Sequence, residues 1–184
     1  MKLDRKTYEI NIAGLVRELP IVQVADNLAI ASFVLLGDAQ LCTRAAEVLK
    51  DKLPECDYFI TAEAKGIPLV QELARMKNMD RFFVARKSIK PYMINPFVTE
   101  VYSITTQKKQ ILCLDESESK LISGKRIIIV DDVISTGESL KAMENLVKRA
   151  GGTIVAETAV LAEGDAAKRD DIIFLESLPV FELK

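Results

Sequence analysis

The sequence predicts an α/β fold with a mostly parallel central sheet flanked by helices, on three observations. Segments with the pattern of short buried strands alternate along the chain with segments of helical periodicity. The run Arg126 to Val130 is continuously apolar after its first residue, as expected of a strand covered on both faces. Asp131 and Asp132 follow that run, and ligands of open parallel sheets bind beyond the carboxyl ends of the strands.

The first half of the chain predicts two helix–strand pairs. Asp38 to Lys52 is expected to be a helix, because Asp38 can cap its first amides and apolar side chains recur on one face. Tyr58 to Thr61 reads as a short buried strand, and a second helix is expected after Gly66. Phe82 to Ala85 is a candidate second strand.

Periodicity fails from Arg86 to about Gln110, where a loop or lid with a loose hairpin fits best. Ile111 to Leu114 is a candidate strand, and the acidic segment 115–120 (DESESK) is expected to form a turn. The strand Arg126 to Val130 is expected to end at the two acids, with a helix starting near Thr136 or Gly137. Thr153 to Leu161 is predicted as a further strand.

Composition excludes several classes of protein. A length of 184 residues suits one domain, and the net charge of −2 gives no general basic field for nucleic acid. The absence of histidine excludes Ser-His-Asp and Cys-His catalysis. Cys42, Cys56 and Cys113 are widely spaced, so we expect buried free thiols rather than disulfides or zinc ligands. Without a secretory signal or a long apolar run, a cytoplasmic protein is expected.

The segment RIIIVDDVISTGESL carries the chemistry. Unpaired amides at the start of the predicted helix can converge on a phosphate, and Gly137 lets the backbone approach it closely. Hydroxyl groups at 135, 136 and 139 can add hydrogen bonds, and the two carboxylates are natural acceptors for a vicinal diol. The alternative is that the acids only end a strand and cap a helix. Segment 119–126 does not fit a Walker A loop, because Ser119 replaces its first glycine.

This pattern, hhhhDD-x-x-x-TG-x-[ST], resembles the phosphoribosyl pyrophosphate signature of type I phosphoribosyltransferases. The resemblance implies that Asp131 and Asp132 bind the ribose hydroxyls at the catalytic centre. It also implies a 5-phosphate loop made of Ser135, Thr136, Gly137, Glu138 and Ser139.

Two earlier segments resemble the same family, and with the signature they match it in order and spacing from Tyr58 to Gly152. The segment TAEAKGIP resembles the loop that holds the pyrophosphate in this family, and its matching positions are Glu63, Ala64, Lys65 and Gly66. The alternative is a plain strand-to-helix turn. Arg86 and Lys87 follow the next strand and could neutralise a departing pyrophosphate, or be a solvated strand end.

The resemblance also implies a type I phosphoribosyltransferase fold over residues 1–184, with a small hood that contributes to the base pocket (1–37) and a flexible lid (88–110). Asp26 and Asn27 are the candidate base-binding residues, and either could instead cap a helix. One departure concerns the lid: Thr105 stands where the adenine enzymes carry a glutamate thought to assist proton transfer, and Glu100 lies nearby but out of register.

The activity implied is that of a purine phosphoribosyltransferase of purine salvage, with adenine favoured because the hood and the C-terminal segment resemble the adenine enzymes. Mg²⁺ is expected to bind mainly through the substrate, without dedicated protein ligands. The expected partners are phosphoribosyl pyrophosphate, a purine base and a second copy in a homodimer, with no nucleic acid or membrane. The alternatives are a regulator that binds phosphoribosyl pyrophosphate without catalysis and an orotate- or xanthine-type enzyme of the same fold.

Overall fold

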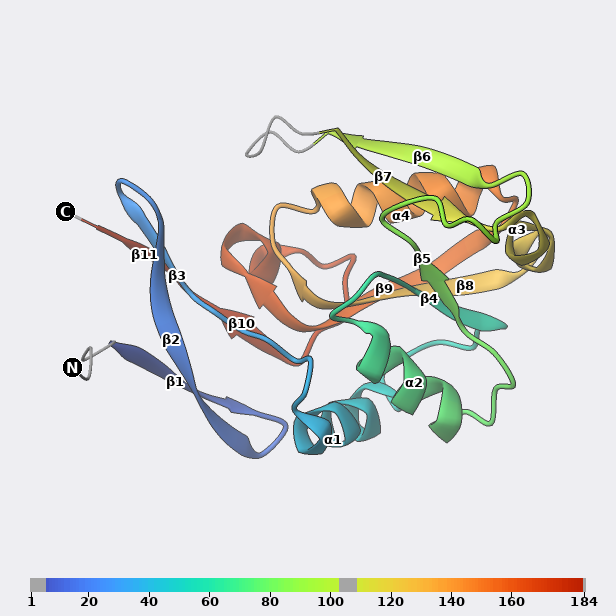
Figure 1. The fold of residues 1–184 in the computed structure, drawn as a ribbon. Helices are drawn as coiled ribbons and strands as arrows, with labels where there is room; N and C mark the ends of the chain where they lie inside the picture. The colour runs from blue at the N-terminus through green and yellow to red at the C-terminus, as the bar shows by residue number, and fades with distance from the viewer. Residues whose placement is uncertain (1–5, 103–108, 184) are drawn as a thin grey trace.

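The computed structural model describes residues 6–102 and 109–183, and Figure 1 shows their arrangement. A five-stranded parallel sheet forms the centre of the molecule, with the strand order β10-β9-β8-β4-β5. Its strands are β4 (Tyr58–Ala62), β5 (Phe83–Ala85), β8 (Arg126–Ile134), β9 (Thr153–Glu163) and β10 (Glu176–Leu178). The predicted α/β class with a parallel sheet is confirmed.

Helices cover both faces of this sheet (Figure 1). Helices α1 (Ala39–Leu49) and α2 (Ile67–Met76) pack on one face, and α4 (Glu138–Arg149) packs on the other. The predicted cap is confirmed, because the Asp38 carboxylate accepts a hydrogen bond from the Leu41 amide at 3.0 Å. Cys42 and Cys113 are buried free thiols as predicted, whereas Cys56 is only half-buried.

A second, antiparallel sheet lies beside the central one (Figure 1), and we call this sheet with the connection to α1 the hood. Its strand order is β1-β2-β3-β11, so the C-terminal strand joins three N-terminal ones. The strands are β1 (Thr7–Ile12), β2 (Leu15–Ala25), β3 (Leu28–Ala31) and β11 (Val180–Glu182). Short connections link β3 to α1 and β10 to β11, and they hold the hood close to the carboxyl ends of the central strands.

The hairpin predicted after Arg86 is present, formed by β6 (Phe97–Tyr102) and β7 (Lys109–Leu114). Its base is fixed to α4, because Arg149 Nη1 donates to the Val98 carbonyl at 2.7 Å and its guanidinium stacks over Phe97. Ile111 to Leu114 is therefore strand as predicted, but it pairs within this hairpin. A short 3-10 helix, η1 (Gly164–Lys168), lies between β9 and β10.

Two boundary predictions were wrong. The expected acidic turn is a helix, α3 (Glu116–Ile122), whose capping box pairs the Asp115 and Glu118 side chains with each other's backbone amides. Strand β8 also does not end at the acids, since its ladder with β9 continues to Ile134. No helix within the described residues has the length and apolarity needed to cross a membrane.

The topology places a ligand site between β4 and β8. These two strands are neighbours in the sheet, but their following helices, α2 and α4, cover opposite faces. The loops after the two strands therefore diverge and leave a crevice at the carboxyl ends, which is where open α/β sheets bind ligands.

Candidate active site

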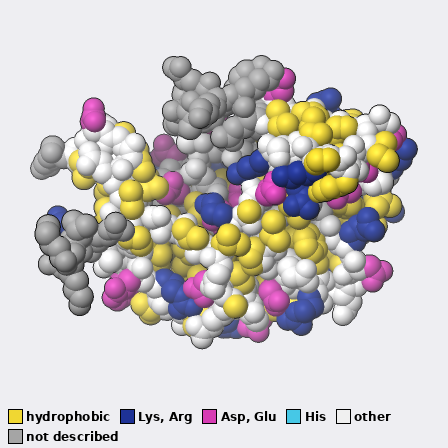
Figure 2. Space-filling view, in the orientation of Figure 1, with side chains coloured by type: hydrophobic (Ala, Val, Ile, Leu, Met, Phe, Trp, Pro, Cys, Tyr) yellow, Lys and Arg dark blue, Asp and Glu magenta, His cyan; other side chains and the backbone are white. Residues whose placement is uncertain are grey.

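A cavity of about 400 Å³ lies at this crevice, within the usual range for a small-molecule site. Its walls come from the loops after β4, β5 and β8, the end of β9, and the hood connection 30–34. Acidic and basic side chains lie close together in the middle of the face shown in Figure 2, between the hood and the core. The cavity therefore has both carboxylates and cations within reach of one ligand.

The two acids of the signature both line the cavity, but in different surroundings. Asp131 is half-buried, and its Oδ1 atom accepts a hydrogen bond from the Asp132 amide at 2.8 Å. Asp132 is only 2% exposed, which differs from what a strand that ends at the two acids would give. The reason is that β8 continues past them and carries Asp132 into the interior.

Lys65 compensates the buried carboxylate. Its Nζ atom lies 2.9 Å from Asp132 Oδ2, an ion-pair distance, but without the angles of a hydrogen bond. Oδ2 is thus a buried oxygen that has no hydrogen-bond donor among the described residues. It can still accept a hydrogen bond from a ligand. Burial, and then the charge of Asp132, raise the pKa of Asp131 to about 7. A ligand that brings hydroxyl donors or a cation would therefore be stabilised by this pair.

The loop after β8 leaves backbone amides unpaired at the start of α4. Gly137 adopts a left-handed conformation with φ +81°, and the first helical bond runs from the Lys141 amide to the Gly137 carbonyl at 2.8 Å. Among the described residues, the amides of 138, 139 and 140 have no acceptor. Residues 133–140 and Asp131 enclose a hollow of about 50 Å³. Unpaired amides with the positive end of the helix dipole suit a phosphate.

All five predicted phosphate-loop residues line these two adjoining hollows. Ser135 and Ser139 border both, and the other three border the smaller one: Thr136, Gly137 and Glu138. Because Asp131 also borders both, the small hollow at the start of α4 and the larger cavity adjoin each other.

The loop after β4 lies against β8. Gly66 is packed so closely that a Cβ atom there would lie 2.2 Å from Thr61 Oγ1 and 3.4 Å from Asp131 Cα. The three preceding residues line the cavity, and Ala64 and Lys65 are exposed to it. The peptide between Glu63 and Ala64 is cis. The predicted pyrophosphate-loop residues are therefore brought together next to the acid pair.

The two cations after β5 are tied to this loop through Glu63. The Lys87 amide donates to Glu63 Oε2 at 3.0 Å, and Arg86 Nη1 lies 3.4 Å from Oε1. The hydrogen bond from the Lys87 amide is the main reason that the pKa of Glu63 is lowered. Lys87 lines the cavity, whereas Arg86 does not and pairs through its backbone with Cys113.

The candidate base-binding residues lie elsewhere. Asp26 and Asn27 form the exposed turn between β2 and β3 and do not line the cavity. The alternative that either one caps a helix was wrong, because strands precede and follow the turn. The hood instead reaches the cavity through residues 30–34, together with Leu178 from β10.

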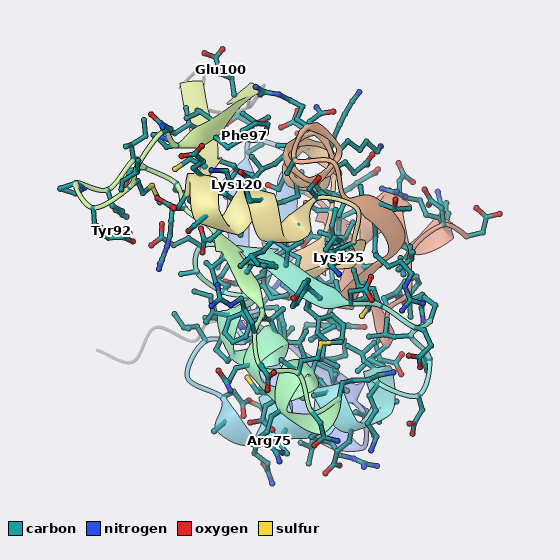
Figure 3. The ribbon with its side chains drawn as sticks, turned by 90° about the vertical axis from the view of Figure 1, so that its right-hand side faces the viewer. Arg75, Tyr92, Phe97, Glu100, Lys120 and Lys125 are labelled. Atoms are coloured by element: carbon teal, nitrogen blue, oxygen red, sulfur yellow. The ribbon has the colours of Figure 1, made fainter. Side chains whose placement is uncertain are left out.

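Sequence reasoning missed Glu163, the last residue of β9, which also lines the cavity. The available signal was an acid that ends an apolar strand, the same pattern that identified the pair on β8. Of the two lid positions considered, Thr105 lies outside the described residues. Glu100 is exposed on β6 and points away from the core in Figure 3.

The fold and this site define a nucleotide- or sugar-phosphate-binding α/β protein, and comparison of the sequence gives the family. The sequence model of the phosphoribosyl transferase domain family matches residues 39–178, so the chain belongs to the phosphoribosyltransferase family. An adenine phosphoribosyltransferase from Thermosipho africanus is 30% identical over 148 residues, which cover 77% of this chain and 84% of that protein. A hypoxanthine/guanine phosphoribosyltransferase from Methanotorris igneus is 32% identical over 146 residues, covering 79% and 73%.

Solved structures share the fold. The adenine phosphoribosyltransferase of Thermoanaerobacter pseudethanolicus has a TM-score of 0.64 at 23% identity, covering 78% of this chain and 84% of that one. The adenine phosphoribosyltransferase of Saccharomyces cerevisiae, solved with an imino-altritol bisphosphate and adenine, has a TM-score of 0.63 at 18% identity, covering 92% of both. These matches confirm the type I phosphoribosyltransferase fold.

Proposed function

We propose that the chain transfers the 5-phosphoribosyl group from phosphoribosyl pyrophosphate to a purine base, giving a nucleoside monophosphate and pyrophosphate. The observation that carries this proposal is that the small hollow with free amides at the start of α4 adjoins the cavity lined by the acid pair. Its relatives include adenine and hypoxanthine/guanine enzymes, and the adenine enzyme from Thermosipho africanus supports adenine as the base.

In this proposal each wall of the site binds one part of the sugar phosphate. The amides that begin α4 bind the 5-phosphate, with hydroxyl donors from the loop residues 135, 136 and 139. Asp131 and Asp132 accept hydrogen bonds from the ribose hydroxyls. The backbone of the loop after β4 and the side chain of Lys65 bind the pyrophosphate, and Lys87 adds a second cation to the same cavity. Positive charge that develops on the ring as pyrophosphate departs would be stabilised by the acid pair.

Mg²⁺ is the cofactor we propose, and the donor set fits it. The ion prefers oxygen ligands and usually binds through one or two carboxylates plus phosphate oxygens. Asp131 and the Oδ2 atom of Asp132, which has an ion-pair partner in Lys65 but no hydrogen-bond donor among the described residues, are the oxygens that could hold it, together with the substrate. When bound, Mg²⁺ would neutralise charge on the leaving pyrophosphate.

Three parts of the proposal rest on the family resemblance. The hood (1–37) would cover the base, and its residues 30–34, which line the cavity, would contact the base in place of Asp26 and Asn27. The segment 88–110 would act as a lid, although the base of its hairpin is fixed to α4 by Arg149. A cytoplasmic homodimer is also proposed.

An activity assay with Mg²⁺ and phosphoribosyl pyrophosphate tests the proposal, with adenine, hypoxanthine, guanine, xanthine and orotate offered separately. We expect a nucleoside monophosphate from adenine in preference to the other bases. Product from orotate alone would contradict a purine enzyme. Binding of phosphoribosyl pyrophosphate without product from any base would favour the non-catalytic regulator.

A further inference from the structure

Among the described residues, four carboxylate side chains line the large cavity, and three of them already have partners. Glu63 is bound by the Lys87 amide and by Arg86. Asp131 accepts from the Asp132 amide, and Asp132 forms an ion pair with Lys65. The fourth carboxylate is Glu163.

Glu163 differs from the other three in having no hydrogen-bond or ion-pair partner in the described part of the chain. Within residues 6–102 and 109–183, no hydrogen bond or ion pair reaches its carboxylate, although the side chain is half-buried. It ends β9 and is paired in register with Leu178 of β10, so both side chains lie on the same face, toward the hood. A half-buried acceptor that faces a cavity and has no donor is placed to receive one from a ligand.

Its surroundings in the cavity are mostly apolar. The end of β3 contributes Ile30 and Ala31, and the connection to α1 contributes Phe33 and Val34, with Ser32 as its one hydroxyl. Lys65 is the charged group in the cavity whose field reaches Glu163, and it already pairs with Asp132. Between the hood and β9 the cavity therefore presents one carboxylate that has no partner among the described residues.

The proposed reaction leaves one proton without an assigned acceptor. The bond between C1 of the ribose and the pyrophosphate oxygen breaks, and its electron pair leaves with pyrophosphate. A ring nitrogen of the purine forms the new bond to C1, and the N–H bond of that nitrogen breaks, leaving its electron pair on the ring. The chain has no histidine, so a carboxylate is the natural side chain to take the proton.

We propose that Glu163 is this acceptor: it accepts a hydrogen bond from the ring N–H of the bound purine and takes the proton as the new bond to C1 forms. The inference rests on the proposed transfer to a purine. The other three carboxylates of the cavity are held by partners or committed to the sugar. Burial also raises the pKa of Glu163, opposed by the charge of Lys65, which makes it a stronger base than an exposed glutamate.

The test is steady-state kinetics of Glu163→Gln in the full chain with adenine, phosphoribosyl pyrophosphate and Mg²⁺. Glutamine keeps the shape of the side chain but cannot take the proton, so kcat should fall by about a hundredfold or more. KM for phosphoribosyl pyrophosphate should stay within about twofold. Glu176→Gln is the matched control, because Glu176 is exposed on the neighbouring β10 and does not line the cavity.

Two further measurements separate proton transfer from a structural role. 8-Azaadenine has a more acidic ring N–H, so the loss caused by Glu163→Gln should shrink with this base. Formate should partly restore Glu163→Ala, because a small carboxylate can occupy the vacated space. A fall in kcat below threefold, or an equal loss with both bases and no response to formate, would overturn the inference. Wild-type protein that transfers to no purine would instead refute the proposed function itself.

Discussion

Replacing Gly137 with alanine tests the phosphate loop with a small and well-defined change. Gly137 has φ +81°, a conformation that alanine adopts at a cost of about 1 to 2 kcal/mol. A Cβ atom there would also lie 3.2 Å from Arg169 Nη1, the end of a flexible side chain that can move aside. The variant should therefore fold, with a melting temperature lowered by about 2 to 8 °C for a chain of this size.

The larger expected effect is on phosphate binding. Relief of the backbone strain turns the adjoining peptide, and this removes at least one amide from the phosphate. A hydrogen bond to a charged group contributes about 1.5 to 3 kcal/mol. Affinity for ribose 5-phosphate, measured by isothermal titration calorimetry, should therefore fall by a factor of about 10 to 150.

Gly124→Ala is the matched control. Gly124 has φ +73°, has no atom within 4 Å of an added Cβ, and lies before β8, at the end of the strand away from the site. It should lose a similar amount of stability without loss of affinity. If both variants lose the same stability and both bind ribose 5-phosphate like the wild type, the loop is not the phosphate site.

Three other substitutions test the surroundings of the acid pair. Asp131→Asn should abolish turnover. The pKa of Asp131 is raised to about 7 in the fold, so the wild-type protein loses stability as pH rises from the unfolded pKa near 4 through the folded pKa. Asparagine cannot ionise and escapes this loss, so the variant should raise the melting temperature more at pH 8 than at pH 4. An unchanged pH slope of the melting temperature would argue against the buried pair. Lys65→Met should weaken pyrophosphate binding, because the cation is removed. It should also destabilise the fold by about 1 to 3 kcal/mol, since the buried Asp132 loses its ion-pair partner. An unaltered affinity for pyrophosphate, measured by calorimetry, would contradict the binding role of Lys65. Gly66→Ala should cost about 1 to 3 kcal/mol in chemical denaturation, because its Cβ would collide with Thr61, and a neutral effect would show that the loop can yield.

The parts of the fold that the sequence predicted depend on local signals. A carboxylate at the start of an apolar helical stripe predicted α1, and a β-branched run predicted β8. The phosphate loop could be predicted because glycine and hydroxyl residues stand together at a helix start. The hood could not be assembled this way, since β11 pairs with β3 across most of the chain length and no local pattern specifies that partner.

The errors have physical causes. Helix α3 was predicted as a turn because the segment is rich in acidic residues. Its capping-box signal, Asp115 followed three residues later by Glu118, was given too little weight. Strand β8 was ended too early because charged residues are rarely buried, but Lys65 comes from another loop and neutralises Asp132. Glu163 was missed because a single acid at a strand end has no motif around it, and only the folded cavity shows what it faces.

The central claim is that the free amides at the start of α4 bind the 5-phosphate of the sugar while the acid pair binds its hydroxyls. A crystal structure of the protein with ribose 5-phosphate and Mg²⁺ tests it most directly. The account predicts phosphate oxygens within 3.2 Å of at least two amides from residues 137–140, with the 2- and 3-hydroxyls on Asp131 and Asp132. A phosphate held by other residues, with these amides facing solvent, would contradict it.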